Sequence, residues 1–301
     1  MDSIVRAIAE DRSLRVVGAT TTKLVREACR RQEARGAEAL VLSRAATSAA
    51  LLATLAKEGK ERVLVQWRTD GPLGRVLADA WGDGRTRVAL ERRLPAQHEL
   101  AGSTAIDLDT RGDVGSLVGT QGHVVVTRDL DLGQQYEGSV EVETGQIDED
   151  VERYLNVSEQ LPSVLRTATV FDDQGNVVKA GGILVQTFPG NDPSIIDAVR
   201  ETLSRDRLWR TMQAGVVAGD LAKLAAGGEA QITRATELSF HCPCGRSRVL
   251  GMLRTLGVHD LRQLADEQEI TEIRCHFCGN RYGVTAKAVR ELADQLAAET
   301  N

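Results

Sequence analysis

Two short motifs near the C-terminus decide how that end of the chain folds: Cys242-Pro243-Cys244 and Cys275-His276-Phe277-Cys278. Thirty residues, 245–274, separate them, and together they hold four of the five cysteines of the chain. Four thiolates spaced as two close pairs can surround one tetrahedral zinc ion. The same four sulfurs can also form two local disulfides. Such a site can act as a switch, because the metal holds a small domain folded only while the sulfurs are reduced.

The tail that carries these motifs, residues 233–301, has little apolar material for a core of its own. Its aromatic residues are Phe240, Phe277 and Tyr282, and all three lie within four residues of a cysteine. Domains this small usually need a metal or disulfides to fold. Because structural zinc contributes roughly 10–16 kcal/mol of apparent binding free energy, we expect loss of the metal to unfold the tail.

Zinc is favoured as the metal because all four ligands are sulfur and the pattern implies no open coordination position. An iron–sulfur cluster is the main alternative. His241 and His276 adjoin cysteines and could each replace a ligand, but four sulfurs already complete the shell. The sequence therefore predicts one closed, all-cysteine zinc site.

The spacing is also typical of an inert structural zinc ribbon, and that interpretation stays open from the spacing alone. Zinc ribbons normally place two residues between the cysteines of both pairs, whereas Pro243 stands alone between Cys242 and Cys244. Such close neighbours can form a small-ring disulfide, which tends to be strained and easily reversed. Each local disulfide would remove two ligands, so two of them would empty the site. Four flanking arginines would favour thiolate over thiol and raise the reactivity toward oxidants: Arg246, Arg248, Arg274 and Arg281.

The composition is that of an ordinary globular protein with an acidic balance. The chain has 301 residues, enough for two domains, with 42% hydrophobic and 27% charged residues. Aromatic residues make up only 3%, so the core must rest on Leu, Val, Ile and Ala. A net charge of −6 argues against a general nucleic-acid-binding protein, which usually carries a basic face.

The sequence contains no stretch long and apolar enough to span a membrane. The first ten residues include Asp2 and Glu10 and no long apolar run, so we expect no signal peptide and a cytoplasmic location. In a reducing cytosol, metal binding explains a cysteine cluster better than standing disulfides do.

Residues 1–189 are predicted to form an α+β domain, in which helices cover a mostly antiparallel sheet. Helices are expected over 22–34, 37–57 and 147–158. Strands are expected over 62–67, 86–90, 123–127, 136–142, 164–171 and 177–187, with another after the turn at 70–74. Asp172-Asp173-Gln174-Gly175-Asn176 is expected to join the last two strands as a hairpin.

Residues 190–232 are predicted to form a helical linker. Asp192 can cap a helix with Pro193 at its first position, and Gly227-Gly228 interrupts the helical pattern. Residues 233–301 then form a small C-terminal zinc-binding domain. Within it, strands are expected over 237–241 and 270–274, and helices over 247–256, 260–266 and 286–298.

The pattern Cys-x-Cys, about thirty residues, Cys-x-x-Cys-Gly-x-x-Tyr resembles that of the 33 kDa chaperonin (heat shock protein 33) family, the redox-regulated holdase chaperones of bacteria. Further family landmarks occur upstream in the expected order: Asp70-Gly71-Pro72-Leu73, Tyr136-x-Gly138, Ser158-Glu159-Gln160-Leu161-Pro162 and Ala180-Gly181-Gly182. The resemblance therefore covers essentially the whole chain.

The resemblance implies a binding protein with no catalytic residues and no need for a nucleotide. One Zn²⁺ on Cys242, Cys244, Cys275 and Cys278 would keep the reduced chain monomeric and inactive. Hypochlorite, or peroxide with heat, would form the Cys242–Cys244 and Cys275–Cys278 disulfides, with release of zinc and unfolding of the tail and the linker. The linker at 190–232 would cover the client surface at rest. The oxidised homodimer would bind unfolded or partly folded client proteins, with no nucleic acid and no membrane as partner.

Two other functions stay open from the residues themselves. A structural zinc-ribbon adaptor would dock a protein or nucleic acid while reduced. A thiol oxidoreductase would use Cys275-x-x-Cys278, although such enzymes usually place the pair at a helix N-terminus. Cys29, in a predicted helix, is interpreted as a half-buried spectator, with an intermolecular disulfide as the alternative. His98-Glu99 and Asp107-x-Asp109-x-Arg111 match metalloprotease and calcium-loop motifs too poorly to carry those functions.

Overall fold

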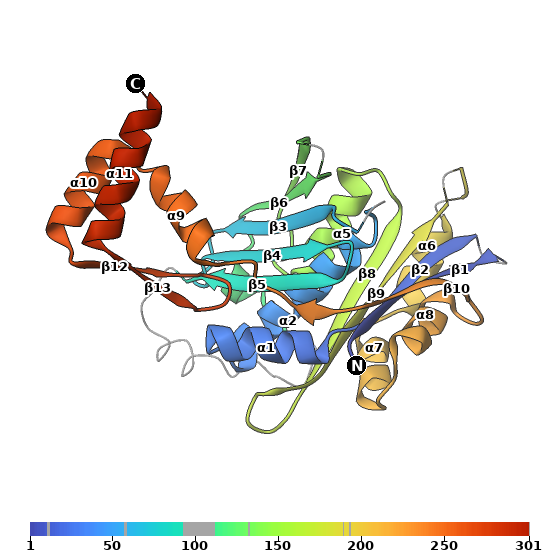
Figure 1. Ribbon diagram of the computed structural model, residues 1–301. Helices are drawn as coiled ribbons and strands as arrows, with labels where there is room; N and C mark the ends of the chain where they lie inside the picture. The colour runs from blue at the N-terminus through green and yellow to red at the C-terminus, as the bar shows by residue number, and fades with distance from the viewer. Residues whose placement is uncertain are drawn as a thin grey trace. The chain divides into compact units, whose positions relative to one another are not determined.

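The computed structural model describes residues 1–10, 13–56, 59–92, 112–131, 133–188, 190–192 and 194–300. Internal contacts divide the chain into an N-terminal unit, Met1–His241, and a C-terminal unit, Cys242–Asn301; Figure 1 colours both along the chain. The functional division into 1–189, 190–232 and 233–301 stays a prediction. The motifs at 98–99 and 107–111 and the proline at 193 lie outside the described residues.

The first sheet of the N-terminal unit has the strand order β10-β1-β2-β9-β8, and every neighbouring pair is antiparallel. Its strands are β1 (Ser3–Ala9), β2 (Leu14–Thr20), β8 (Ser163–Phe171), β9 (Val177–Thr187) and β10 (Gln231–Glu237). The predicted hairpin between β8 and β9 is confirmed. The Gln174 and Asn176 amides both donate to Asp172, and Gly175 takes a left-handed φ of 73° that favours glycine.

The second sheet has the strand order β11-β5-β4-β3-β6-β7. Its strands are β3 (Arg62–Thr69), β4 (Arg75–Trp81), β5 (Arg85–Glu91), β6 (Gly122–Asp129), β7 (Gln135–Glu141) and β11 (Ser239–Phe240). The short β11 pairs with β5 in parallel, and the other pairs are antiparallel. The predicted α+β class with mostly antiparallel pairing is confirmed, with the strands divided between two sheets.

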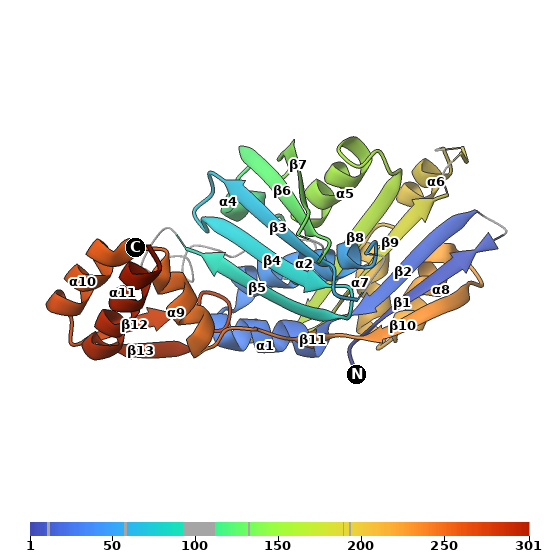
Figure 2. The same cartoon turned by 45° about the horizontal axis from the view of Figure 1, so that its top comes forward.

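Helix α2 (Gly36–Ala53) contacts strands of both sheets and lies between them, as can be followed in Figure 2. Every residue from Ala39 to Ala53 is buried, and apart from Arg44 their side chains are apolar or small, as a helix buried on all sides requires. The buried Arg44 donates to Gln146 at 2.7 Å. The many alanines of α2 allow the sheets to approach closely. The unit also contains α1 (Thr22–Gln32), α4 (Gly115–Val118) and α5 (Asp148–Val157).

Three further helices, which we call the linker helices, pack on the first sheet: α6 (Ser194–Thr202), α7 (Arg205–Gln213) and α8 (Ala218–Ala226). They confirm that this region is helical. They share one buried apolar cluster with the sheet, distinct from the core around α2. Helix residues of this cluster include Ile196, Val199, Leu203, Leu208, Met212 and Leu221, and sheet residues include Leu14, Val16, Val164, Ile183 and Val185. The packing is so close that a Cβ atom at Gly18 of β2 would collide with the backbone of Ala218 and Ala222 in α8.

The C-terminal unit consists of a hairpin and the helices α9 (Arg246–Arg254), α10 (Gly257–Glu267) and α11 (Ala286–Thr300). The hairpin strands, β12 (Ile270–Arg274) and β13 (Arg281–Thr285), pair antiparallel. Apart from a cysteine, its buried apolar side chains are Val249, Leu253, Leu261, Ala265, Val284, Val289, Leu292 and Ala293. So small a core agrees with the expectation that the unit needs a further constraint to fold.

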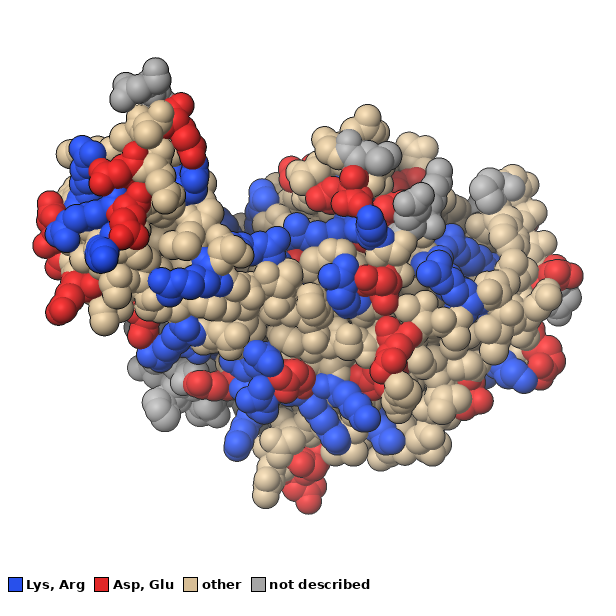
Figure 3. Space-filling model, viewed as in Figure 1, with Lys and Arg blue, Asp and Glu red and all other residues tan. Residues whose placement is uncertain are grey.

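Among the helices that the structure describes, none is long and apolar enough to cross a membrane. On the face drawn in Figure 3, basic and acidic side chains are interspersed among uncharged ones.

Candidate metal centre

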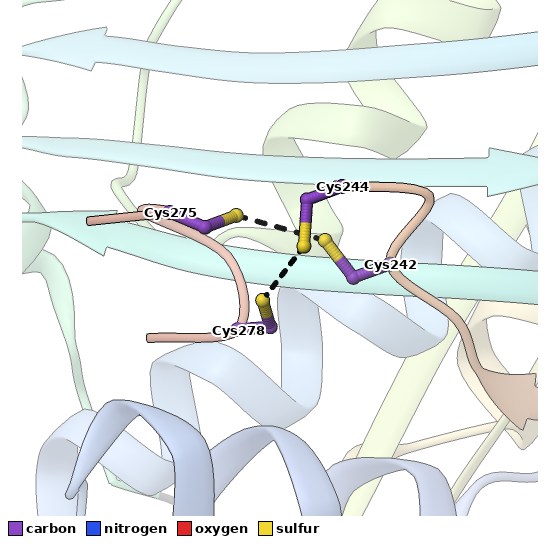
Figure 4. A group of neighbouring side chains, drawn as sticks. All are labelled: Cys242, Cys244, Cys275 and Cys278. Atoms are coloured by element: carbon purple, nitrogen blue, oxygen red, sulfur yellow. Dashed lines mark hydrogen bonds between the residues drawn. The ribbon is translucent and has the colours of Figure 1, made fainter. Parts of the chain in front are cut away.

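The four cysteines of the two motifs meet at one point of the C-terminal unit (Figure 4). Cys242 and Cys244 precede α9, and Cys275 and Cys278 lie in the turn between β12 and β13. All four Sγ atoms lie within 4.8 Å of one another. The Sγ–Sγ distance is 3.7 Å from Cys242 to Cys275 and 3.2 Å from Cys244 to Cys278.

These separations fit a single bound ion. Four sulfurs held tetrahedrally at about 2.3 Å from one zinc ion would lie about 3.8 Å from each other. A disulfide needs a sulfur–sulfur distance of about 2.05 Å, and none of the four cysteines is in a disulfide. The sequence-based expectation that the two motifs converge on one site is therefore met by the geometry.

The turn that carries the second motif is shaped by backbone hydrogen bonds around Cys275. The Cys275 N–H donates to the Asn280 carbonyl, and the Gly279 N–H donates to the Cys275 carbonyl, both at 2.9 Å. Gly279 has a φ of 71°, in the left-handed region that favours glycine. This tight turn brings the Cys275 and Cys278 sulfurs together, which explains the glycine that follows the motif.

The arginines beside the motifs contact oxygen atoms. Arg246 donates to the Gly283 carbonyl and Arg248 to the Pro243 carbonyl, each at 3.2 Å. Arg281 pairs with a carboxylate of β12 at 3.2 Å. These side chains brace the two arms of the site, and the hypothesis that they favour the thiolate stays a prediction.

Burial raises the pKa of both thiols in the second motif, Cys275 and Cys278. Cys278 is only 5% exposed, and for both residues desolvation disfavours the thiolate more than nearby amides favour it. Four sulfurs this close can all be thiolates only when a cation compensates their charge. An all-sulfur shell suits a borderline or soft metal ion. The four cysteines are thus placed to bind one metal ion.

Tyr282 of β13 contacts the site; the sequence pattern included this residue but assigned it no contact with a cysteine. Its hydroxyl donates to Cys244 Sγ at 3.1 Å, and this bond raises the pKa of the phenol. Hydrogen bonds to metal-binding side chains orient the ligands and tune their reactivity. The available signal was its place four residues after Cys278 in the Cys-Gly-x-x-Tyr pattern, and in the structure Tyr282 lies opposite Ile273, close to the hairpin turn.

The histidines beside the motifs are not part of the group. Within the part of the chain that the structure describes, the metal-capable cluster consists of the four cysteines. His241 lies edge-on to Trp81 in the N-terminal unit, with ring centroids 6.5 Å apart, and His276 is exposed. The four-sulfur shell favoured by the sequence therefore agrees with the arrangement of the side chains.

Cys29, the fifth cysteine, is buried in α1 of the N-terminal unit. It is 8% exposed, less than the half-buried position that the sequence suggested. Burial raises its pKa to about 12. Because the thiolate is the reactive form, this environment favours a spectator over a partner in an intermolecular disulfide.

Comparison with known proteins places the chain in a family. The family model for the Hsp33 protein matches residues 2–285. The chain is 33% identical to a 33 kDa chaperonin of Cyanothece sp. over 308 residues, which cover 99% of this chain and 98% of the relative. It is also 33% identical to a 33 kDa chaperonin of Deinococcus radiodurans, with 96% and 97% covered. The chain belongs to the Hsp33 family of chaperones.

A solved structure supports the fold. The crystal structure of a 33 kDa chaperonin from Thermotoga maritima matches with a TM-score of 0.81 at 24% identity and covers 99% of both chains. The family predicted from the cysteine pattern and the upstream landmarks is confirmed.

Proposed function

We propose that this chain is a redox-regulated holdase, which binds unfolding proteins and prevents their aggregation under oxidative stress. One observation carries the proposal: a chain of the Hsp33 family combines four cysteine thiols, whose sulfurs lie within 4.8 Å of one another, with linker helices that cover an apolar sheet face. Oxidation can destroy the four-cysteine site, and undocking of the linker helices can uncover the apolar sheet face. The protein acts by binding, without catalytic residues and without a nucleotide.

In the resting state, Cys242, Cys244, Cys275 and Cys278 hold one Zn²⁺. Zinc suits a closed four-sulfur shell, where it serves structure rather than catalysis. The free energy of binding is then folding free energy for the C-terminal unit, whose own core is small. In this state the chain is monomeric and inactive as a chaperone.

Activation is the oxidation of the two motifs to Cys242–Cys244 and Cys275–Cys278 disulfides. In each motif two thiolates lose two electrons to hypochlorite or peroxide as one S–S bond forms, and the two bonds leave no sulfur to hold the metal. At rest Cys242 Sγ lies 3.7 Å from Cys275 Sγ, and Cys244 Sγ lies 3.2 Å from Cys278 Sγ, so each sulfur of one motif also contacts a sulfur of the other. Oxidation can therefore in principle form local or crossed disulfides, and we propose the local ones. Peptide mapping distinguishes local from crossed disulfides, and crossed ones would contradict this step.

Loss of the metal unfolds the C-terminal unit, and the linker helices leave the first sheet. The uncovered face includes Leu14, Val16 and Ile183, which the linker helices now bury. Unfolding proteins expose apolar segments that such a patch can hold, and two oxidised chains form a homodimer. A switch based on reduced cysteines suits a compartment that is normally reducing, so we place the protein in the cytoplasm.

A client-aggregation assay tests the proposal. Reduced and oxidised protein are added to a chemically unfolded client, light scattering is followed, and a zinc indicator records release. We expect protection only after oxidation, with one metal ion released per chain. Equal protection by the reduced and the oxidised protein, or no protection by either, would overturn the proposal. Metal-dependent binding of a partner by the reduced form alone would favour an adaptor instead.

A further inference from the structure

Helix α5 covers the free edge of the first sheet with a ladder of side chains. Strand β8 is the last strand of this sheet, so alternate amides point away from it. Asp148, Glu152 and Asn156, spaced four residues apart on α5, accept these amides. The donors are Thr167, Leu165 and Ser163, at 2.9, 2.8 and 2.9 Å. An open strand edge is thereby satisfied by side chains instead of another strand.

The two carboxylates of this ladder use their second oxygen to hold the linker helices. Asp148 Oδ1 accepts from Arg205 of α7 at 2.7 Å, and Glu152 Oε1 accepts from Arg200 of α6 at 3.1 Å. Glu149 also accepts from Arg205, at 3.0 Å. Asp148 is fully buried and the Arg205 side chain is 14% exposed, so the pairing is largely removed from water.

Apolar and cationic side chains alternate on the docked segment. Val199 and Leu203 enter the apolar cluster on the sheet, while Arg200 and Arg205, close by in the sequence, reach the carboxylates of α5. The linker helices thus bind this surface by combining apolar burial with guanidinium–carboxylate pairs. A pocket of about 380 Å³ opens along the same row and is lined in part by Glu149, Glu152 and Arg200.

Departure of the linker helices leaves the acidic row undercompensated. For these three carboxylates the body of the N-terminal unit offers Arg166, which pairs with Glu152, and Arg44, which favours the charged forms of Asp148 and Glu149. Arg153 lines the same pocket but is paired with Glu143. Three carboxylates then face two body arginines beside a newly exposed apolar face. Leaving a buried carboxylate without its partner is strongly unfavourable, so an occupant that brings a cation is preferred over one that does not.

We propose that the surface uncovered by α6 and α7 selects unfolded client segments in which apolar residues alternate with arginine or lysine, and disfavours acidic segments. The linker segment is the template for such a client, because it satisfies the same surface with the same chemistry. This inference rests on the proposed function, since it requires oxidation to remove the linker helices.

The test uses the oxidised full-length chain and three labelled, unstructured peptides of equal length and equal Leu and Val content. They carry two Arg, two Gln or two Glu residues. Fluorescence anisotropy at low salt gives each affinity. We expect the Arg peptide to bind about tenfold more tightly than the Glu peptide, with the Gln peptide between them. The double variant Glu149→Gln, Glu152→Gln should lose most of this preference, because two of the three carboxylates become neutral. The edge of the sheet should stay covered, because the new side-chain amide oxygen at position 152 can still accept the Leu165 N–H. The control Glu137→Gln, Glu141→Gln changes the same charge on exposed positions of β7 and should keep it.

Salt provides a second measurement that needs no variant. Raising the ionic strength from about 0.05 M to about 0.5 M should remove most of the charge preference of the wild-type chain. Equal affinity for the three peptides, or a preference that survives both the double substitution and salt, would overturn the inference and leave the holdase proposal standing. Binding of none of the peptides in either redox state would overturn both. Peptide binding that disappears as the chain concentration rises would identify a second copy as the occupant and overturn the client assignment.

Discussion

Glu152 of α5 lies 3.1 Å from Arg200 of α6, while its other carboxylate oxygen accepts the Leu165 amide at 2.8 Å. One side chain therefore covers the edge of the first sheet and holds a linker helix. Asp148 does the same with Thr167 and Arg205. Docking of the linker helices is consequently tied to the same residues that finish the sheet, and the chain offers several ways to loosen the linker without touching a cysteine.

Arg205→Ala should loosen the linker helices in the fully reduced protein. The substitution removes the partner of the buried Asp148 carboxylate, which costs about 3 kcal/mol, the low end for a broken buried pair, because Arg44 still compensates part of the charge. Limited proteolysis of residues 194–226 and the client assay measure the effect. Arg210→Ala, a 72% exposed arginine of the same helix, is the matched control. Equal protease resistance of the two variants would contradict this account.

Gly18→Ala should also release α8, by a steric route that leaves every charge in place. The added methyl group would meet the backbone of Ala218 and Ala222, so helix and strand must move apart. We expect partial chaperone activity under reducing conditions with unchanged metal content. Gly190→Ala is unsuitable as a control because of its positive φ, but Gly228→Ala has open space at the Cβ position and suits the purpose. Full repression in the Gly18 variant would show that α8 does not guard the client surface.

Cys244→Ser should weaken metal binding and loosen the C-terminal unit even under reducing conditions. It removes one of four sulfurs and the acceptor of the Tyr282 hydroxyl, and the remaining apolar core is too small to compensate. Metal content per chain and hydrogen exchange in α9–α11 report the change. Cys29→Ser makes the same chemical change in the N-terminal unit and should leave the metal content intact. An unchanged stoichiometry in the Cys244 variant would exclude this cysteine as a ligand.

Oxidation of the native protein should consume four of its five thiols. Burial raises the pKa of the Cys29 thiol to about 12, and Cys29 lies outside the group of four cysteines whose thiolates a metal ion would stabilise, so it has little of the reactive thiolate form at neutral pH. Alkylation and mass spectrometry after a short oxidant pulse should find Cys29 still reduced, while denatured protein should lose all five thiols at similar rates. Early loss of the Cys29 thiol, or a Cys29-linked dimer on a non-reducing gel, would argue against the spectator role.

Acid should undock α7 only at low pH. Burial alone would raise the pKa of Asp148, but Arg205, Arg44 and the two bonds from Thr167 outweigh it and hold the pKa below its usual value. A depressed carboxyl pKa stabilises the fold above the unfolded value of about 3.9 and loses this contribution as the pH falls through the folded value. Burial raises the pKa of Glu149, so this second partner of Arg205 is protonated first as the pH falls. In mild acid the ion pair between Asp148 and Arg205 should be enough to keep α7 docked.

The fluorescence of Trp209 in α7 reports this transition in the reduced protein. The variant Trp209→Phe gives the background signal of Trp67 and Trp81, which is subtracted. We expect a change below about pH 4. The Asp148→Asn variant should lack this step. A transition near neutral pH, or one that persists in the Asn variant, would assign it to another group.

The local pattern of the sequence determined a large part of this protein. The spacing of the cysteines predicted one four-sulfur site, and the four sulfurs lie together in the C-terminal unit. The strand at 177–187 and the hairpin that precedes it were predicted at their observed positions. The strand and the hairpin depend on residues near each other in the chain, because turn geometry and alternation act over a few residues. The metal site was predictable although its two motifs are thirty residues apart, because four cysteines in two close pairs are a recognisable ligand set.

Only the tertiary structure decided how distant segments meet. The pairing of β1 with β10 joins residues such as Ile4 and Thr236, which are far apart in the sequence. The strands are divided into two sheets because both sheets bury α2, and the local sequence pattern of the strands does not indicate which sheet each one joins. The ion pairs from α5 to the linker helices have the same origin: Asp148 and Arg205 are ordinary surface residues in sequence terms. They become a pair because the fold removes both from water and leaves each as the other's partner.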